Sequence, residues 1–172
     1  AALAALLAYL HETVMADLSQ INRLSFLDAA ETMQLDIDTL RNLEITRSLR
    51  DGGKKNTLFD VLDFTRTPMG TRLLKSWLEH PLLTPHRIDA RLDAVAELVE
   101  KSTLRADLRD ALHTVYDFER LLTRIETQTA NARDLVALRV SLAALPAVRE
   151  ILGTAASSLL VRAHASIETF DE

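Results

Sequence analysis

The sequence predicts an all-α fold, and three observations lead to that prediction. Apolar residues make up 48% of the 172-residue chain, and leucine and alanine, which enter helices readily, dominate among them. Only 4 glycines and 4 prolines are present to form the many turns that a sandwich or barrel needs. Apolar residues also recur at helical spacing along most of the chain. We therefore expect a multi-helical domain of roughly seven to nine helices, with at most one short extended segment near residues 33–37.

The first predicted element is an amphipathic helix that ends near Asn22. Its buried face is formed by apolar residues three or four positions apart, namely Leu3, Leu7, Leu10, Val14, Leu18 and Ile21. Residues 25–38 break this pattern. Between Met33 and Ile37 apolar and polar residues alternate, which favours a short extended piece. A turn of helix through Leu40 and Leu43 is expected next.

Capping residues mark the helices in the middle of the chain. Thr57 lies at capping-box spacing before Asp60. Thr67-Pro68 and Thr84-Pro85 each pair a hydroxyl N-cap with proline at the first helical position, where the missing N–H is not needed. We expect one helix to follow each of these three signals, and the second to stop before residue 81.

The last third of the sequence predicts four more helices. The first covers the stripe from 104 to 115, and the second covers 118–125 behind an Asp117 cap. Asn131, with Asp134 three residues later, begins a longer helix that Pro146 should kink or end. Gly153 is a stop signal, and a final helix is expected over residues 157–167.

Composition excludes several classes of function. The chain has no cysteine, so disulfide scaffolds, cysteine-based zinc sites, iron–sulfur clusters and thiol nucleophiles are ruled out. No apolar run reaches the length of about 18–20 residues that spans a bilayer, so no membrane partner is expected. The net charge of −5 argues against a dedicated nucleic-acid binder, which is usually basic.

The basic segment around residues 41–55 is the candidate binding site. Arg47, Arg50, Lys54 and Lys55 are candidates for weak phosphate contacts, although a solvated charged surface is favoured because no aromatic residues are interleaved for base stacking. The Gly52-Gly53-Lys54-Lys55 stretch lacks the glycine spacing of a Walker A loop, so a solvated turn is the better interpretation. Scattered histidines and surface carboxylate pairs give no metal or acid–base site. We predict no catalytic, cofactor-binding or metal-binding residue.

One ordered set of motifs indicates a protein family. Together these motifs resemble the core domain of the MutS family of DNA mismatch-repair proteins over essentially the whole chain. They are Leu35-Asp36, Asn42-Leu43-Glu44, Gly53 to Leu58, Met69-Gly70, Arg72-Leu73-Leu74, Trp77-Leu78, Ile88 to Val95, Asp117 to Ile125 and Asn131 to Leu135.

The resemblance implies a non-enzymatic role. In that family the core domain is a helical lever between a DNA-gripping clamp, which is inserted within it, and a C-terminal ATPase that dimerises. We assign neither the family's mismatch-reading wedge nor its Walker A loop to this chain. ATP and magnesium are thus expected in the parent protein and no cofactor in this chain. The alternatives are the core of a MutS-like recombination or branched-DNA protein, and a stand-alone helical interaction module.

The resemblance also implies an organisation and partners. Residues 1–22 would lead in from the connector domain, 23–152 would form the first part of the core, and 153–172 would begin the lever helix toward the clamp. The expected partners are other domains of the same protein and double-stranded DNA, with a homodimeric parent in the bacterial cytoplasm. The chain begins without methionine and inside a predicted helix, so we expect a fragment whose uncovered apolar stripe promotes self-association.

Finally, the resemblance gives individual residues structural roles. We expect the apolar core to contain Leu73, Leu74, Trp77, Leu78, Leu92, Val95, Phe118, Leu121 and Leu122. Arg72 and Arg124, which are flanked by apolar stripes, would join helices through salt bridges. Trp77 would be buried where helices cross, and its replacement by alanine is expected to lower stability by about 3–5 kcal/mol.

Overall fold

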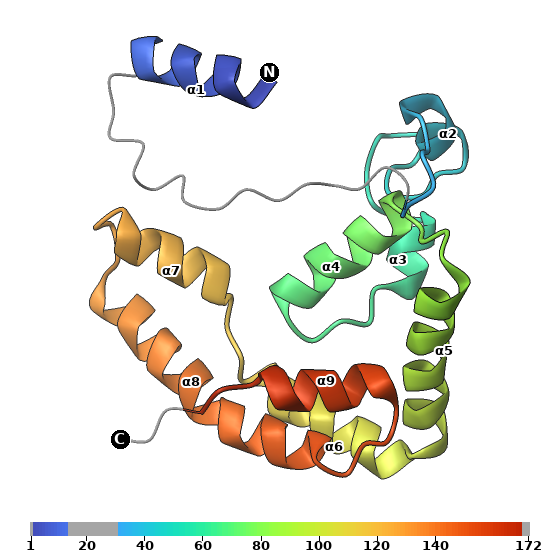
Figure 1. Ribbon diagram of the computed structural model, residues 1–172, viewed down its shortest axis with the longest axis vertical. Coiled ribbons are helices and arrows are strands. Elements are labelled where there is room, and N and C mark those ends of the chain that lie inside the picture. The colour runs from blue at the N-terminus through green and yellow to red at the C-terminus, as the bar shows by residue number, and fades with distance from the viewer. Residues whose placement is uncertain (1, 14–30, 170–172) are drawn as a thin grey trace.

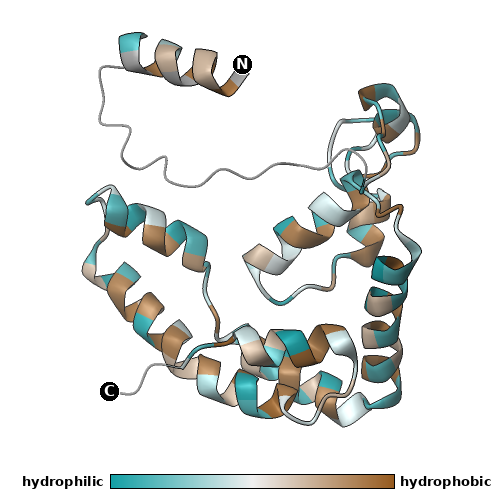
Figure 2. Ribbon diagram, viewed as in Figure 1, coloured by the Kyte–Doolittle hydropathy of each residue, from teal (hydrophilic) through white to brown (hydrophobic). Residues whose placement is uncertain are grey.

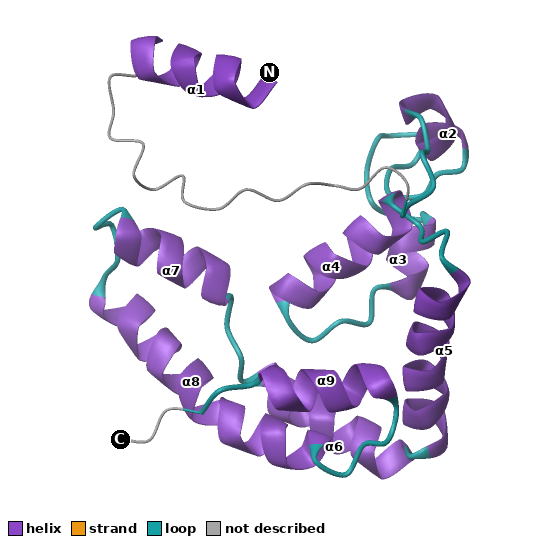
Figure 3. Ribbon diagram, in the orientation of Figure 1, coloured by secondary structure: helices purple, strands orange, loops and turns teal. Residues whose placement is uncertain are grey.

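The computed structural model describes residues 2–13 and 31–169 of the chain, and these residues are helical and contain no strand (Figures 1 and 3). The helices are α1 (Ala2–Thr13), α2 (Ile37–Asn42), α3 (Leu58–Leu62), α4 (Pro68–Glu79), α5 (Pro85–Glu100), α6 (Ser102–His113), α7 (Phe118–Glu126), α8 (Ala132–Leu152) and α9 (Ser158–Ser166). The all-α prediction is confirmed. Extended backbone appears as a single antiparallel bridge between Thr32 and Leu82, while the expected extended stretch near 33–37 runs into α2 at Ile37.

Most of the predicted helix starts are confirmed in atomic detail. The Thr57 hydroxyl accepts a hydrogen bond from the Asp60 amide, and the Thr67 hydroxyl accepts one from the Gly70 amide. Asn131 and Asp134 form a complete capping box at the start of α8. Thr84 precedes Pro85 as expected but makes no side-chain capping bond. Local capping chemistry therefore sets most of these boundaries.

Two of the predicted helix ends are not found within the residues that the structure describes. The predicted first helix reaches Thr13 as α1, and its remainder, to Asn22, lies outside the described residues. The longer helix does not end at Pro146, because α8 runs through it to Leu152 and stops at Gly153. Proline removes one backbone hydrogen bond from the helix interior. Here α8 packs against both α6 and α9, and such packing outweighs the local loss.

The apolar core lies where α5, α6, α8 and α9 pack together (Figures 1 and 2). Its most buried apolar residues are Ala94, Leu104, Val148 and Leu152, and Val115 and Leu121 extend it toward α7. A second, smaller cluster holds Ile45 and Phe59 near α3 and α4. Among the described residues, no helix is long and apolar enough to cross a membrane.

The predicted core set is only partly buried. Leu121 is buried, and Leu74, Trp77, Leu78 and Phe118 are half-buried. The prediction is wrong for four residues, which are exposed: Leu73 (51%), Leu92 (59%), Val95 (58%) and Leu122 (49%). Helical spacing identifies an apolar face, but it does not identify what covers that face. On α5 the exposed stripe also includes Val99, so much of one face of this helix is left uncovered by the described residues.

Candidate phosphate-contact loop and the Arg72 cluster

The basic loop (residues 44–57) is closed by its own hydrogen bonds. Glu44 has a φ of 47°, and its carboxylate accepts a hydrogen bond from the Leu49 amide at 2.6 Å. The Ser48 amide donates to the Gly53 carbonyl at 2.8 Å, and the Gly52 amide donates back to the Ser48 carbonyl at 2.9 Å. Gly52 has a φ of 70°, a conformation that glycine adopts without strain.

These bonds decide what the loop can bind. A phosphate-cradling loop needs free backbone N–H groups that point at the ligand. The Leu49 and Gly52 amides are already bonded within the loop, and the Gly53 amide donates to the Asp51 carboxylate at 2.9 Å. These three amides are therefore not available to a ligand, and the interpretation of the loop as a solvated turn stays a prediction.

The four predicted phosphate contacts separate into two groups. The Lys54 ammonium pairs with the Asp63 carboxylate at 2.6 Å and lies 4.5 Å from the centre of the Phe59 ring. Hydrogen bonds from Lys54 and Thr65 hold the pKa of Asp63 below its usual value. Arg47, Arg50 and Lys55 are exposed and make no ion pair with any described residue. Contact with phosphate stays a prediction, and these three residues are the ones free to make it.

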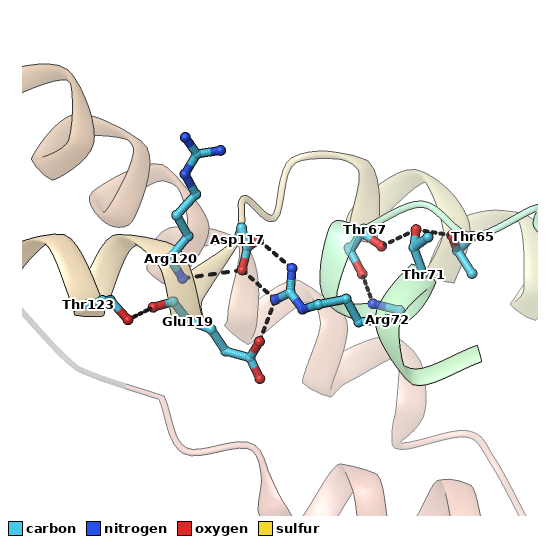
Figure 4. A network of polar contacts seen from close by, with 9 residues as sticks. Thr65, Thr67, Thr71, Arg72, Asp117, Glu119, Arg120 and Thr123 are labelled. Atoms are coloured by element: carbon cyan, nitrogen blue, oxygen red, sulfur yellow. Dashed lines mark hydrogen bonds and ion pairs between the residues drawn. The ribbon is translucent and has the colours of Figure 1, made fainter. Parts of the chain in front are cut away.

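Arg72 joins α4 to the start of α7. Its two terminal nitrogens donate to the two Asp117 carboxylate oxygens at 2.7 and 2.8 Å, and one of them also donates to Glu119 (Figure 4). We call these three residues the Arg72 cluster. The hydrogen bonds that Arg72 donates to Asp117 and Glu119 raise the pKa of Arg72, and Arg72 in turn lowers the pKa of Asp117. The expected salt-bridge role of Arg72 is confirmed.

Arg124 makes the corresponding connection between α7 and α8. Its guanidinium lies 3.0 Å from the Asp134 carboxylate, which is also the second member of the capping box that starts α8. The predicted salt bridge is confirmed. Asp117 combines the same two functions, because it caps α7 by accepting from the Arg120 amide while it binds Arg72. Cap residues thus serve as the acidic partners of both arginines.

A chain of threonine contacts links the basic loop to the Arg72 cluster. Asp63, the partner of Lys54, accepts a hydrogen bond from the Thr65 hydroxyl at 2.6 Å. The Thr65 hydroxyl lies 2.6 Å from that of Thr71, whose oxygen is also 3.2 Å from the Thr67 carbonyl oxygen (Figure 4). Thr71 directly precedes Arg72 in α4. The polar contacts therefore run without a break from Lys54 to the turn that carries Arg72.

Sequence reasoning missed most of this network. Asp117 was identified only as a helix cap, and Asp63, Thr65 and Thr71 carried no functional prediction. Their partners lie up to 45 residues apart in sequence, so spacing alone gives no signal for the pairing. Among the described residues, no group of three or more histidine, aspartate and glutamate side chains is placed to hold a metal ion.

Comparison with known proteins gives one consistent result. A family model described as MutS domain III matches residues 38–171. A DNA mismatch repair protein MutS from Symbiobacterium thermophilum is 50% identical over 168 residues, which is 98% of this chain and 19% of that protein. The same protein from Pelotomaculum thermopropionicum is 45% identical over 173 residues (100% and 20%), and that from Methanosarcina mazei is 48% identical over 167 residues (96% and 19%). The chain thus spans about a fifth of the length of these curated relatives.

Proposed function

The chain belongs to the MutS family of DNA mismatch-repair proteins, where it corresponds to domain III, and we propose that it serves its parent protein as a non-catalytic lever. In this role it couples a DNA-gripping clamp and a mismatch reader to an ATPase domain. ATP and magnesium act on the parent protein, and this chain contributes no catalytic group. The bacterial cytoplasm, a homodimeric parent and the three-part division at residues 22 and 152 stay predictions of the same kind.

The Arg72 cluster is the observation that carries the proposal. A lever needs helices whose mutual positions are held firmly enough to transmit a displacement. Arg72 connects α4 to α7 through a bidentate contact, and Arg124 connects α7 to the long α8. Bidentate pairs fix direction as well as distance. Movement of the α4 end is thereby transmitted to α7 and from there along α8, which has 21 residues.

The test uses a chimaera in which this chain replaces the matching segment of the Symbiobacterium thermophilum protein. ATP hydrolysis is measured without DNA, with a homoduplex and with a G·T duplex. We expect Arg72→Met to reduce the mismatch-dependent change in hydrolysis by roughly two- to tenfold while leaving hydrolysis without DNA unchanged. Arg133→Met is the matched control, since Arg133 is exposed on the first turn of α8 and makes no ion pair with a described residue.

Two results would contradict the lever. One is an Arg72→Met chimaera that responds to the mismatch as the parent chimaera does. The other is an isolated chain that itself binds a G·T duplex tightly and selectively in a fluorescence titration. We expect the isolated chain to bind DNA weakly, without preference for a mismatch, and not to hydrolyse ATP.

Self-association is the second part of the proposal. Leu92, Val95 and Val99 form an exposed apolar stripe along α5, with exposed fractions of 58–63% for the two valines. Contiguous apolar surface of this kind tends to find a partner. We expect the isolated chain to associate with itself at high concentration, and Val95→Glu to reduce that association. A monomer at every concentration in light scattering would show that the stripe does not drive association.

A further inference from the structure

A second concentration of positive charge lies away from the basic loop. A cleft of about 310 Å³ opens between α4, α5 and α9. In Figure 1, α4 and α9 lie on the same side of α5. Its apolar wall includes Trp77 and Leu159, and its polar groups are His86, Arg87, Arg91 and Arg162. No aspartate or glutamate is among the described residues that line it.

The three arginines are incompletely neutralised. Arg87 pairs with Glu31, which is not part of the cleft wall. Arg91 lies over the Trp77 ring, with its guanidinium carbon 3.6 Å from the ring centre, and makes no ion pair with a described residue. Arg162 likewise makes none. Burial and the neighbouring charge of Arg87 lower the pKa of Arg91, as is usual for a cation that shares a site with another cation.

The acidic residues of α5 do not compensate for this charge. Asp93, Glu97 and Glu100 line a different cleft, next to Lys101, with which Glu97 forms an ion pair at 2.8 Å. Asp89 is exposed and lines neither cleft. Positive charge gathered around the half-buried Arg91 is unfavourable unless an anion joins it. The cleft therefore has the charge and the volume of an anion site.

We propose that the cleft between α4, α5 and α9 binds a phosphate group. Phosphate presents several acceptor oxygens, and guanidinium groups recognise it through two parallel hydrogen bonds. The charge of free phosphate or a phosphomonoester, about −1.5 to −2 at pH 7, also matches two unpaired arginines better than a single carboxylate does. The indole of Trp77 holds Arg91 in one orientation, so less side-chain entropy is lost on binding. Two sources share this chemistry, free phosphate or a small phosphomonoester on the one hand and the DNA backbone on the other.

The chain contains a single tryptophan, and it lines this cleft. Trp77 emission is therefore a local reporter of binding. Inorganic phosphate is titrated into the 172-residue chain at constant ionic strength, with sodium chloride replaced step by step. We expect a saturable change in emission. A change that follows ionic strength alone, and that is the same in chloride, would overturn the proposal.

Arg162→Gln is the informative variant, because Arg162 is exposed and its loss breaks no hydrogen bond or ion pair with a described residue. We expect it to raise the half-saturating phosphate concentration about tenfold, as the loss of one charge-assisted hydrogen bond predicts. Arg139→Gln is the matched control on α8, where the arginine is exposed and outside the cleft. It should titrate like the unmodified chain. If Arg162→Gln and Arg139→Gln titrate alike, Arg162 does not contact the phosphate and the proposed site is wrong.

A duplex titration in phosphate-free buffer distinguishes the two sources. If a duplex changes Trp77 emission and inorganic phosphate displaces it, the cleft takes a backbone phosphate. If phosphate saturates the signal and a duplex leaves it unchanged, the cleft takes a small phosphate compound. If neither produces a saturable signal, the proposal is wrong. None of these outcomes depends on the lever, which is tested by ATP hydrolysis in the chimaera.

Discussion

Ser141 gives the sharpest test of how this fold is held together. It lies in α8 with no exposed surface. Its hydroxyl accepts a hydrogen bond from the Tyr116 amide at 2.9 Å and donates one to the Ala137 carbonyl at 2.8 Å. Tyr116 directly precedes Asp117, so Ser141 fixes the segment that presents Asp117 to Arg72. Ser141→Ala removes this acceptor with almost no change in volume.

The magnitude follows from two opposing effects. The bond between the Tyr116 amide and Ser141 is partly buried, and an amide left without an acceptor costs about 1–3 kcal/mol, with the upper value for full burial. Alanine has a higher helix propensity than serine, and this offsets roughly 0.5 kcal/mol of that cost. We therefore expect the free energy of unfolding to fall by about 0.5–2.5 kcal/mol. For a chain of this size, that lowers the melting temperature by roughly 1–10 °C and the urea midpoint by roughly 0.2–1.2 M.

The assay is urea unfolding followed by far-ultraviolet circular dichroism. Ser76→Ala is the matched control, since Ser76 lies within α4, is exposed, and makes no side-chain hydrogen bond with a described residue. The control should unfold at the same urea concentration as the unmodified chain or slightly above it. Hydrogen exchange of the Tyr116 amide should accelerate in Ser141→Ala alone. Equal midpoints for the two variants, or unchanged exchange at Tyr116, would refute the reasoning.

Three further predictions concern acid stability, the tryptophan and the basic loop. Hydrogen bonds from Lys101 and from the backbone of residues 156–157 lower the pKa of Glu97 from 4.5 to about 2. The stability that ionised Glu97 contributes is therefore fully present above pH 4.5 and is lost as pH falls toward 2. In thermal unfolding measured at pH 6, 4 and 2.5, the unmodified chain should therefore lose more stability on acidification than Glu97→Gln does. Trp77 is half-buried, so Trp77→Ala should cost about 1.5–3 kcal/mol in urea unfolding, below the value for a buried tryptophan. In the basic loop, Arg50→Gln or Lys55→Gln should weaken DNA binding and reduce the slope of log affinity against log salt concentration by roughly one. Lys54→Gln, which removes the internal ion pair with Asp63, should leave the affinity and the slope unchanged.

The helix starts were predictable because their chemistry is local. The hydroxyl of Thr67 reaches an amide three residues away, and Asn131 and Asp134 satisfy each other's backbone within one turn. Such bonds depend on a few neighbouring residues, which a single sequence displays in full. The same holds for Gly153, where α8 ends.

Burial was less predictable because it depends on distant parts of the chain. Leu92 and Val95 have the spacing of a core face, as Leu121 has, yet only Leu121 is covered within the described residues. The continuation of α8 through Pro146 has the same origin, since α6 and α9 support that helix from outside. The four basic candidates were equivalent in sequence, and only the position of Asp63 separates Lys54 from the others.

The use of arginine in this chain follows from how its helices meet. Arg72 binds Asp117, Arg91 lies on Trp77, and Arg109 donates to the Phe64 carbonyl at 3.0 Å. Each contact joins the segment containing α3 and α4 to a later helix. Arginine suits such joints because its planar group fixes geometry without requiring a dry interface. The contacts between α6 and α8, in contrast, bury apolar residues and resist displacement. If domain III acts as a lever, the arginine joints should therefore transmit a displacement of the segment containing α3 and α4 to the later helices, while α6 and α8 move as one body.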